Sequence, residues 1–119
     1  MALQHLDSTS ISNQSGSITY DTTLFGTVDI SRYVKYGNIV EVHFRGQLSS
    51  EINNTTEFLT LPFTKNYGGQ LGFIAYGTNH YFPTNVIPLW AISGATVKPT
   101  ATVASGNWIH ISFTYIANS

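Results

Sequence analysis

A strict alternation of apolar and polar residues over two long segments constrains the fold of this chain more than any other feature. In segment 39–48 the residues expected to face inward are Val40, Val42, Phe44, Gly46 and Leu48, with Glu41, His43, Arg45 and Gln47 facing outward. A second alternating segment, 108–116, follows Gly106 and Asn107. A period of two residues is that of a β-strand with one buried face. Each segment therefore predicts a long, half-buried strand.

The rest of the chain reads as shorter strands separated by turns. The predicted strands are 17–20, 24–30 with 32–36 as a continuation, 58–61, 70–76, 86–92 and 95–98. Pro88 cannot donate a backbone hydrogen bond, so it indicates a sheet edge or a bulge within its strand. No stretch of 11 or more residues has apolar positions at helical spacing without interruption by Gly, Pro or a β-branched residue. We therefore predict an all-β domain, an antiparallel β-sandwich or jelly roll.

Composition narrows the classes of partner. The chain has 119 residues, which fits one domain, and its formal net charge is -1. Charged residues make up 9% of the chain, against about 25% in ordinary globular proteins. The five Lys and Arg residues are scattered singly, so we expect no nucleic acid partner. No apolar run approaches the length of a membrane span, so we expect no membrane partner. Residues 1–15 have the composition of a flexible connector, and 16–119 form the predicted domain. Alternatively, residues 1–15 form an arm that packs on a neighbouring subunit.

The sequence offers little for catalysis or metal binding. Asp29 and Glu41 lie in predicted strands, where a solvated face or an interface ion pair explains them better than a pair of glycosidase carboxylates. There is no Gly-x-Ser-x-Gly motif, although a Ser-His-Asp triad assembled in space is left open. No two histidines have the spacing of metal ligands on one strand or helix turn. His43 and His110 either meet across a sheet or around a symmetry axis, or are two ordinary half-exposed histidines. We expect no catalytic residue, no metal and no cofactor.

The best candidate for ligand binding is an aromatic cluster around the turn at Gly77. Aromatic faces stack on the apolar faces of sugar rings, and Asn and His side chains bind sugar hydroxyls. Loops held by a rigid β-scaffold are frequent binding sites. Alternatively, the two aromatic residues after His80 simply anchor the loop. The predicted saccharide-binding residues are Tyr76, Asn79, His80, Tyr81, Phe82, Asn85 and Trp90.

Four short motifs, taken in order, resemble a known family. They are 36–40 (YGNIV), 58–62 (FLTLP), 89–97 (LWAISGATV) and 106–116 (GNWIHISFTYI). This order is similar to that of the C-terminal receptor-binding head domains of tail-fibre and baseplate proteins from phages that infect Gram-positive bacteria. The match spans 16–119. In this family a second proline commonly follows the Leu-Pro; here 63–69 intervenes, and 76–83 matches no motif of the family.

The resemblance implies a homotrimer of β-sandwich heads on the virion, joined to an upstream fibre or baseplate region. Such a head binds host cell-surface polysaccharide without catalysis. A trimer would also account for apolar residues on the polar faces of strands. The predicted subunit-interface residues are Ile39, His43, Arg45, Trp108 and His110. The alternatives are a structural baseplate, neck or head-decoration module without ligand, a monomeric carbohydrate-binding module of a secreted enzyme, and a small glycan esterase or hydrolase.

Overall fold

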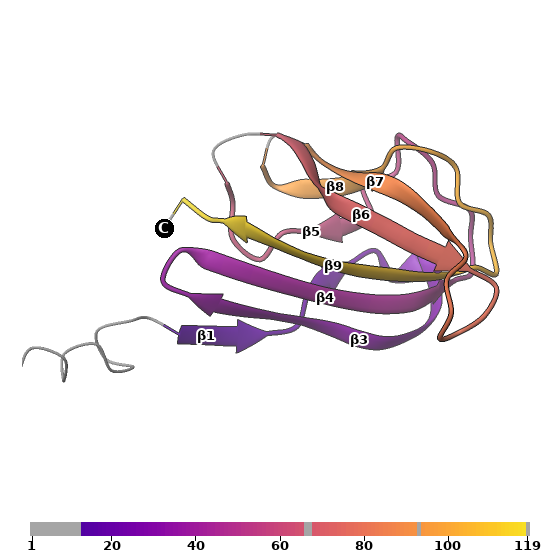
Figure 1. Ribbon diagram of the computed structural model, residues 1–119, viewed down its shortest axis with the longest axis horizontal. Coiled ribbons are helices and arrows are strands. Elements are labelled where there is room, and N and C mark those ends of the chain that lie inside the picture. Colours follow the sequence, from indigo (N-terminus) through magenta and orange to yellow (C-terminus); the bar gives the residue numbers. More distant parts are fainter. Residues whose placement is uncertain (1–12, 66–67, 93, 119) are drawn as a thin grey trace, which may run out of the picture.

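The computed structural model describes residues 13–65, 68–92 and 94–118, and the paired strands in these ranges are antiparallel and form one sheet (Figure 1). The spatial order of the strands is β1-β3-β4-β9-β6-β7-β8-β5-β2. Their bounds are β1 Asn13–Gly16, β2 Thr19–Tyr20, β3 Phe25–Tyr36, β4 Ile39–Leu48, β5 Leu59–Thr60, β6 Gly69–Gly77, β7 Asn85–Ile92, β8 Thr96–Pro99 and β9 Trp108–Ile116. The prediction of an all-β, antiparallel domain is confirmed.

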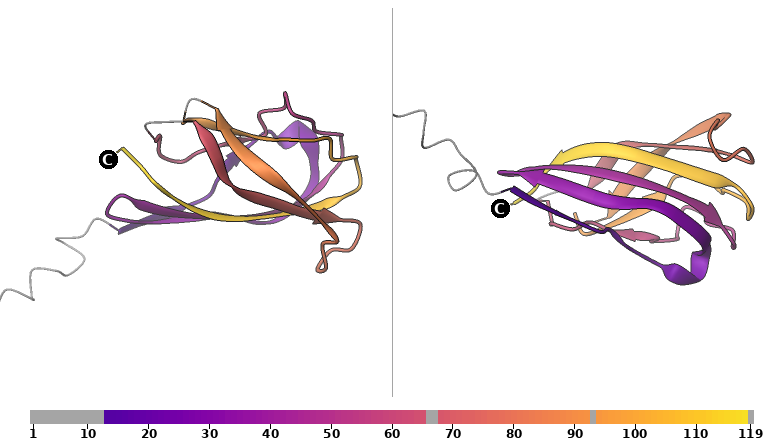
Figure 2. Two further views of the ribbon diagram at one scale, coloured as in Figure 1. Left: turned by 45° about the horizontal axis from the view of Figure 1, so that its top comes forward. Right: turned by 90° about the horizontal axis from the view of Figure 1, so that it is seen from below.

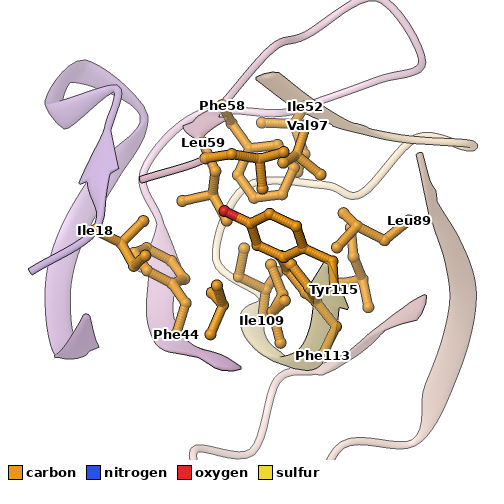
Figure 3. Close-up of a cluster of buried hydrophobic side chains, with 14 of the residues drawn as sticks. Ile18, Phe44, Ile52, Phe58, Leu59, Leu89, Val97, Ile109, Phe113 and Tyr115 are labelled. Atoms are coloured by element: carbon orange, nitrogen blue, oxygen red, sulfur yellow. The ribbon is translucent and has the colours of Figure 1, made fainter. Parts of the chain in front are cut away.

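The sheet curls into a half-barrel, which brings its two ends face to face across the core (Figure 2). Tyr20 of β2 meets Phe44 of β4 edge to face at 5.3 Å between ring centroids, although the two strands lie far apart in the sheet order. Figure 3 shows the enclosed cluster, to which both ends and the centre of the sheet contribute side chains. A single curled sheet thus encloses the core, and the β-sandwich or jelly-roll arrangement stays a prediction.

The alternation that predicted strands β4 and β9 is confirmed. All five inward positions of β4 are buried, and so are Ile109, Ile111, Phe113 and Tyr115 of β9. Gly46 is the inward position without a side chain, because a Cβ there would lie 3.0 Å from Val28 and 3.1 Å from Phe25. The aromatic ring of Phe25 uses this space to reach the centre of the core, where it packs edge to face against Phe44.

Several boundaries differ from the sequence prediction. The sheet begins at Asn13, because 13–16 pair with 33–36 of β3, whereas the predicted connector ran to residue 15. Residues 1–12 of that connector lie outside the described ranges. A 3₁₀ turn at Thr22–Leu24, where no helix was predicted, is capped by the carboxylate of Asp21, which accepts a hydrogen bond from Thr23 N at 3.0 Å.

Pro88 lies in a part of β7 that is locally an edge, as its sequence predicted. The ladder between β7 and β8 begins at Leu89, so the segment 85–88 pairs with β6 on one side only. The carbonyl oxygen of Pro88 accepts a hydrogen bond from Thr100 Oγ1 at 2.7 Å, which ties this stretch to the chain beyond β8.

The outer face of β3, β4, β9, β6 and β7 has two distinct ends. At the first, which we call the hairpin end, Tyr36, Ile39 and Ile116 lie in one row across three strands, beside Asn13. At the second, the loop end, Gln47 pairs with Trp108 and the segment 78–84 joins β6 to β7 (Figure 1). Ten residues of β4 separate these ends by roughly 30 Å.

Candidate functional site

A β-bulge in β3 places a carboxylate on the outer face near the loop end. Val28 pairs with Gly46 and Ile30 pairs with Arg45, so Asp29 is the extra residue of the bulge. A bulge interrupts the strict alternation of side chains. As a result, Asp29 and Ile30 both border a hollow on the outer face, although they are adjacent in sequence.

Asp29 is the centre of a charged network. Arg45 donates to it from Nε at 2.9 and 3.1 Å and from Nη2 at 2.9 Å, a forked arrangement. His80 Nε2 lies 2.7 Å from the second carboxylate oxygen of Asp29. Hydrogen bonds from Arg45 lower the pKa of Asp29 to about 2, and the bond from His80 acts in the same direction. Asp29 is therefore an ionised acceptor at neutral pH, and His80 Nε2 must carry the proton of their shared bond.

Two aromatic rings enclose the imidazole of His80. Its ring centroid lies 3.7 Å from that of Trp108 and 4.2 Å from that of Tyr81, with 20° between the planes in both cases. Two rings at these distances cannot occupy the same face, so His80 is stacked between them. The guanidinium of Arg45 lies over the Tyr81 ring at 5.4 Å, within cation–π range. The network and the stack together attach the 78–84 loop to β3, β4 and β9.

The loop presents two aromatic side chains to solvent. Tyr81 is 62% exposed and Phe82 is 70% exposed. Asn79 Oδ1 accepts hydrogen bonds from Tyr81 N at 2.9 Å and Phe82 N at 3.2 Å, which fixes the backbone beneath both rings. Thr84 N donates to the carbonyl oxygen of Tyr76 at 3.1 Å where the loop rejoins the sheet. The aromatic pair is therefore exposed on a braced support.

The structure distributes the predicted saccharide-binding residues over four places. His80, Tyr81 and Phe82 lie together in the loop, and Asn79 supports them from within it. Tyr76 is half-buried and packs against the core. Asn85 is exposed at the start of β7 and donates from Nδ2 to Thr84 Oγ1 at 3.2 Å. Trp90 is 42% exposed further along β7, where it pairs with Gln70 and Lys98.

The five predicted subunit-interface residues share the outer face of the sheet. Ile39 lies at the hairpin end, whereas Trp108 lies at the loop end against His80. Between them, His43, Arg45 and His110 line one hollow of about 420 Å³. Its other lining residues are Ile30, Phe44, Phe73, Ala75, Val86, Ile111 and Ser112. A second hollow of about 560 Å³ shares Ile30 and His43 with the first and adds Asp29, Ser31 and Arg32.

His110 is the unusual polar group of the first hollow. Its Nε2 is enclosed and has no hydrogen-bond partner among the described residues. Burial lowers the pKa of His110 below its usual value of 6.5, and the positive charge of Arg45 lowers it further. The imidazole is therefore neutral at pH 7. His43 Nδ1 and Ser112 Oγ form a hydrogen bond of 3.1 Å in the same hollow.

Among the described residues, no group of three or more His, Cys, Asp or Glu is arranged to hold a metal ion. The same part of the chain contains no helix with the length and apolarity that crossing a membrane requires. No family model and no curated protein matches the chain.

Sequence reasoning missed the hollow and the network around Asp29. Phe73 and Val86 were assigned to strands, and their exposed fractions of 53% and 63% were not anticipated. A signal was present for His110, since a histidine in the outward row of a long strand was already a candidate for an interface. No local pattern in the sequence indicated that Asp29 would meet both Arg45 and His80.

Proposed function

We propose that this chain is a virion attachment domain that binds neutral polysaccharide on the host cell surface and catalyses no reaction. The observation that carries the proposal is the exposed pair Tyr81 and Phe82, held on a braced loop at the end of the sheet opposite Asn13. A domain joined to a fibre through its N-terminal side would present this loop outward. The resemblance of the chain to receptor-binding heads of phage tail fibres and baseplates points the same way.

The electrostatics around the loop favour an uncharged ligand. Asp29 and Arg45 neutralise each other in a forked ion pair, so each charge already has its partner within the protein. A carboxylate whose pKa lies near 2 is a poor general acid at neutral pH, so Asp29 suits a role in holding the loop. Flat aromatic surfaces next to a neutral ion pair fit a sugar ring, which offers an apolar face and hydroxyl groups.

The hairpin end suits assembly into a homotrimeric, jelly-roll-like head. Tyr36, Ile39 and Ile116 form a row of large apolar side chains that are 47%, 50% and 64% exposed. Contiguous exposed apolar residues are typical of protein–protein contacts. We assign subunit contact to this row. Of the five interface residues that the sequence predicted, Ile39 belongs to it. Three copies joined here would allow weak saccharide sites to act together.

Binding to purified wall polysaccharides from a panel of Gram-positive bacteria tests the proposed function. Wild-type protein should bind at least one of them, and Tyr81→Ala with Phe82→Ala should bind it at least tenfold more weakly. Thr60→Ala, an exposed change on β5, serves as the control and should bind as wild type. Failure to bind any wall would refute the attachment proposal and favour a structural virion module. Release of reducing sugar or acetate during the incubation would indicate an enzyme.

A further inference from the structure

The two hollows on the outer face share Ile30 and His43, and together we call them the groove. The first is lined by residues from five strands that are consecutive in the sheet: Ile30 of β3, His43 of β4, His110 of β9, Phe73 of β6 and Val86 of β7. The second adjoins it at Ile30 and His43 and extends it over β3. Four steps between neighbouring strands of about 4.8 Å give a length of roughly 19 Å. The groove is therefore longer than a single sugar ring.

The lining of the groove combines apolar walls with a few polar atoms. Phe73 and Val86 supply exposed apolar surface on one side, and Ile30 supplies it near the other. Among the described residues His110 Nε2 has no hydrogen-bond partner, and the hydrogen-bonded pair His43 and Ser112 lines the same hollow. A pocket with mainly apolar walls and a few convergent polar groups is the usual form of a small-ligand site.

The state of His110 defines what it can bind. The ring is neutral at pH 7, because burial lowers its pKa and the positive charge of Arg45 lowers it further. A neutral imidazole has one N–H donor and one ring nitrogen that accepts a hydrogen bond. An uncharged hydroxyl or amide group of a ligand suits it in either tautomer.

We infer that this groove binds several consecutive units of an uncharged polysaccharide chain lying across the strands. Hydroxyl or amide groups of the chain bond to His43, His110 and Ser112, the polar side chains of the lining. The apolar faces of the rings lie against Phe73, Val86 and Ile30. The inference rests on the proposed function and deepens it, because it assigns binding of an extended chain to the sheet face. It also assigns His43, Arg45 and His110 to the ligand instead of to a subunit contact.

Two substitutions test the groove by different means. Ala75→Leu places a larger side chain between His110 and Val86, its register partners on β9 and β7, and fills the hollow without altering a hydrogen bond. His110→Phe keeps a planar ring but removes both ring nitrogens. The control Thr114→Leu lies on the exposed outer face of β9 but outside the groove lining. Urea unfolding midpoints identify any variant with a damaged fold.

The ligands are oligosaccharides of one to six units, size-fractionated from a wall polysaccharide that the wild-type protein binds. Isothermal titration should show affinity rising with each unit until the groove is filled, and levelling off beyond it. Ala75→Leu and His110→Phe should each weaken binding of the longer fragments by roughly tenfold, the effect of one lost hydrogen bond or contact. Thr114→Leu should bind as wild type. The imidazole NMR signals of His110 should shift on binding.

The alternative outcomes separate the inference from the proposed function. The groove is refuted, and attachment stands, if Ala75→Leu and His110→Phe bind as wild type while Tyr81→Ala and Phe82→Ala abolish binding. A single unit that binds as tightly as the hexamer also refutes it, since the ligand would then be a terminal sugar. If the wild-type protein binds none of the wall polysaccharides, the proposed function itself fails, and the inference fails with it.

Discussion

The imidazole of His80 stacks on the indole of Trp108 at 3.7 Å between ring centroids, which joins the 78–84 loop to the last strand of the sheet. Trp108 is at the start of β9, next to Gln47 of β4 and Gly77 of β6. The stack thus joins the loop to an interior strand of the sheet and not to an edge strand. Loops that carry exposed aromatic residues are commonly mobile, and this contact gives the loop a rigid support.

Trp108→Ala should loosen the loop. Amide hydrogen exchange at Tyr81 and Phe82, whose N–H groups bond to Asn79, should accelerate, and the free energy of unfolding should fall by about 1–2 kcal/mol. Exchange measured by NMR provides the test. Trp90→Ala, another partly exposed tryptophan of the outer face, should leave these two amides unchanged. Equal acceleration in both variants would show that the stack does not support the loop.

Asp29→Asn should reveal the contribution of the charged network through its dependence on pH. The pKa of Asp29 is lowered from 3.8 to about 2 in the folded protein. The carboxylate therefore stabilises the fold above pH 3.8, and this stabilisation is lost as the pH falls through about 2. Urea unfolding should show wild type more stable than Asp29→Asn at pH 5, with the difference falling to a small fraction of that value at pH 2. Glu51→Gln, an exposed carboxylate, is the control, and a pH-independent difference for Asp29→Asn would contradict the prediction.

Tyr115→Phe should destabilise the protein by about 1–2 kcal/mol. The phenol of Tyr115 donates to the Phe63 carbonyl oxygen at 2.6 Å and accepts from Phe63 N at 3.2 Å, so the change leaves two partners unpaired. Burial raises the pKa of Tyr115 from 10.0 to about 12. The neutral phenol thus stabilises the fold below pH 10, and this is lost as the pH rises toward 12.

Unfolding of Tyr115→Phe measured at pH 8 and at pH 11.5 tests both parts of this prediction. The variant should lose less stability than wild type between these two values. Tyr36→Phe, at an exposed position, should behave as wild type at both. A Tyr115→Phe protein with wild-type stability at pH 8 would refute the role of the bond to Phe63.

The long strands were predictable because a local pattern specifies them. In β4 the polarity of each residue shows which face of the sheet it occupies. The register with β9 then follows, because the buried faces of both strands must meet the core. The site depends on information that is not local. Asp29 meets Arg45 only because a bulge adds one residue to β3, and a bulge has no fixed sequence signature when no glycine marks it. The contact with His80 then depends on how the 78–84 loop folds back.

The predicted ligand-binding residues also show how far local sequence information reaches. The 76–85 cluster was predicted from its aromatic and polar composition. Tyr81 and Phe82, at its centre, are exposed, as is usual for side chains in a loop. Tyr76 was grouped with them by proximity in sequence, but it belongs to a strand and packs against the core. Proximity along a strand does not keep side chains together, because successive residues point to opposite faces.

Gly94→Ala should destabilise the protein more than Gly106→Ala. Both glycines have positive φ, 73° and 91°, so a side chain costs backbone strain of about 1–2 kcal/mol at either position. At Gly94 a Cβ would also lie 2.0 Å from the carbonyl oxygen of Lys65, whereas nothing lies within 4 Å at Gly106. Thermal unfolding of the two variants measures the difference. Equal losses of stability in the two variants would mean that the backbone near Lys65 moves aside without a cost in free energy.

Ile39→Glu and Ile116→Glu should each convert the proposed trimer into monomers. The two residues are register partners at the hairpin end, and a buried, unpaired carboxylate there opposes association. Light scattering behind a sizing column should give three chains for wild type and one for either variant. Val86→Glu, an equally exposed apolar residue outside the hairpin end, should remain trimeric. A monomeric wild type would contradict the assembly and favour an isolated carbohydrate-binding module.

Asn13 and Asn118, the first and last residues described, both lie toward the hairpin end, since Asn13 pairs with Tyr36 and Ala117 N donates to the Asn38 carbonyl oxygen beside it. The loop between β6 and β7 projects from the opposite end (Figure 1). Changes in loop length cost little, about 0.6 kcal/mol for each doubling. Under the proposed function, the aromatic part of the saccharide site can therefore change with this one segment while the sheet and its register stay the same.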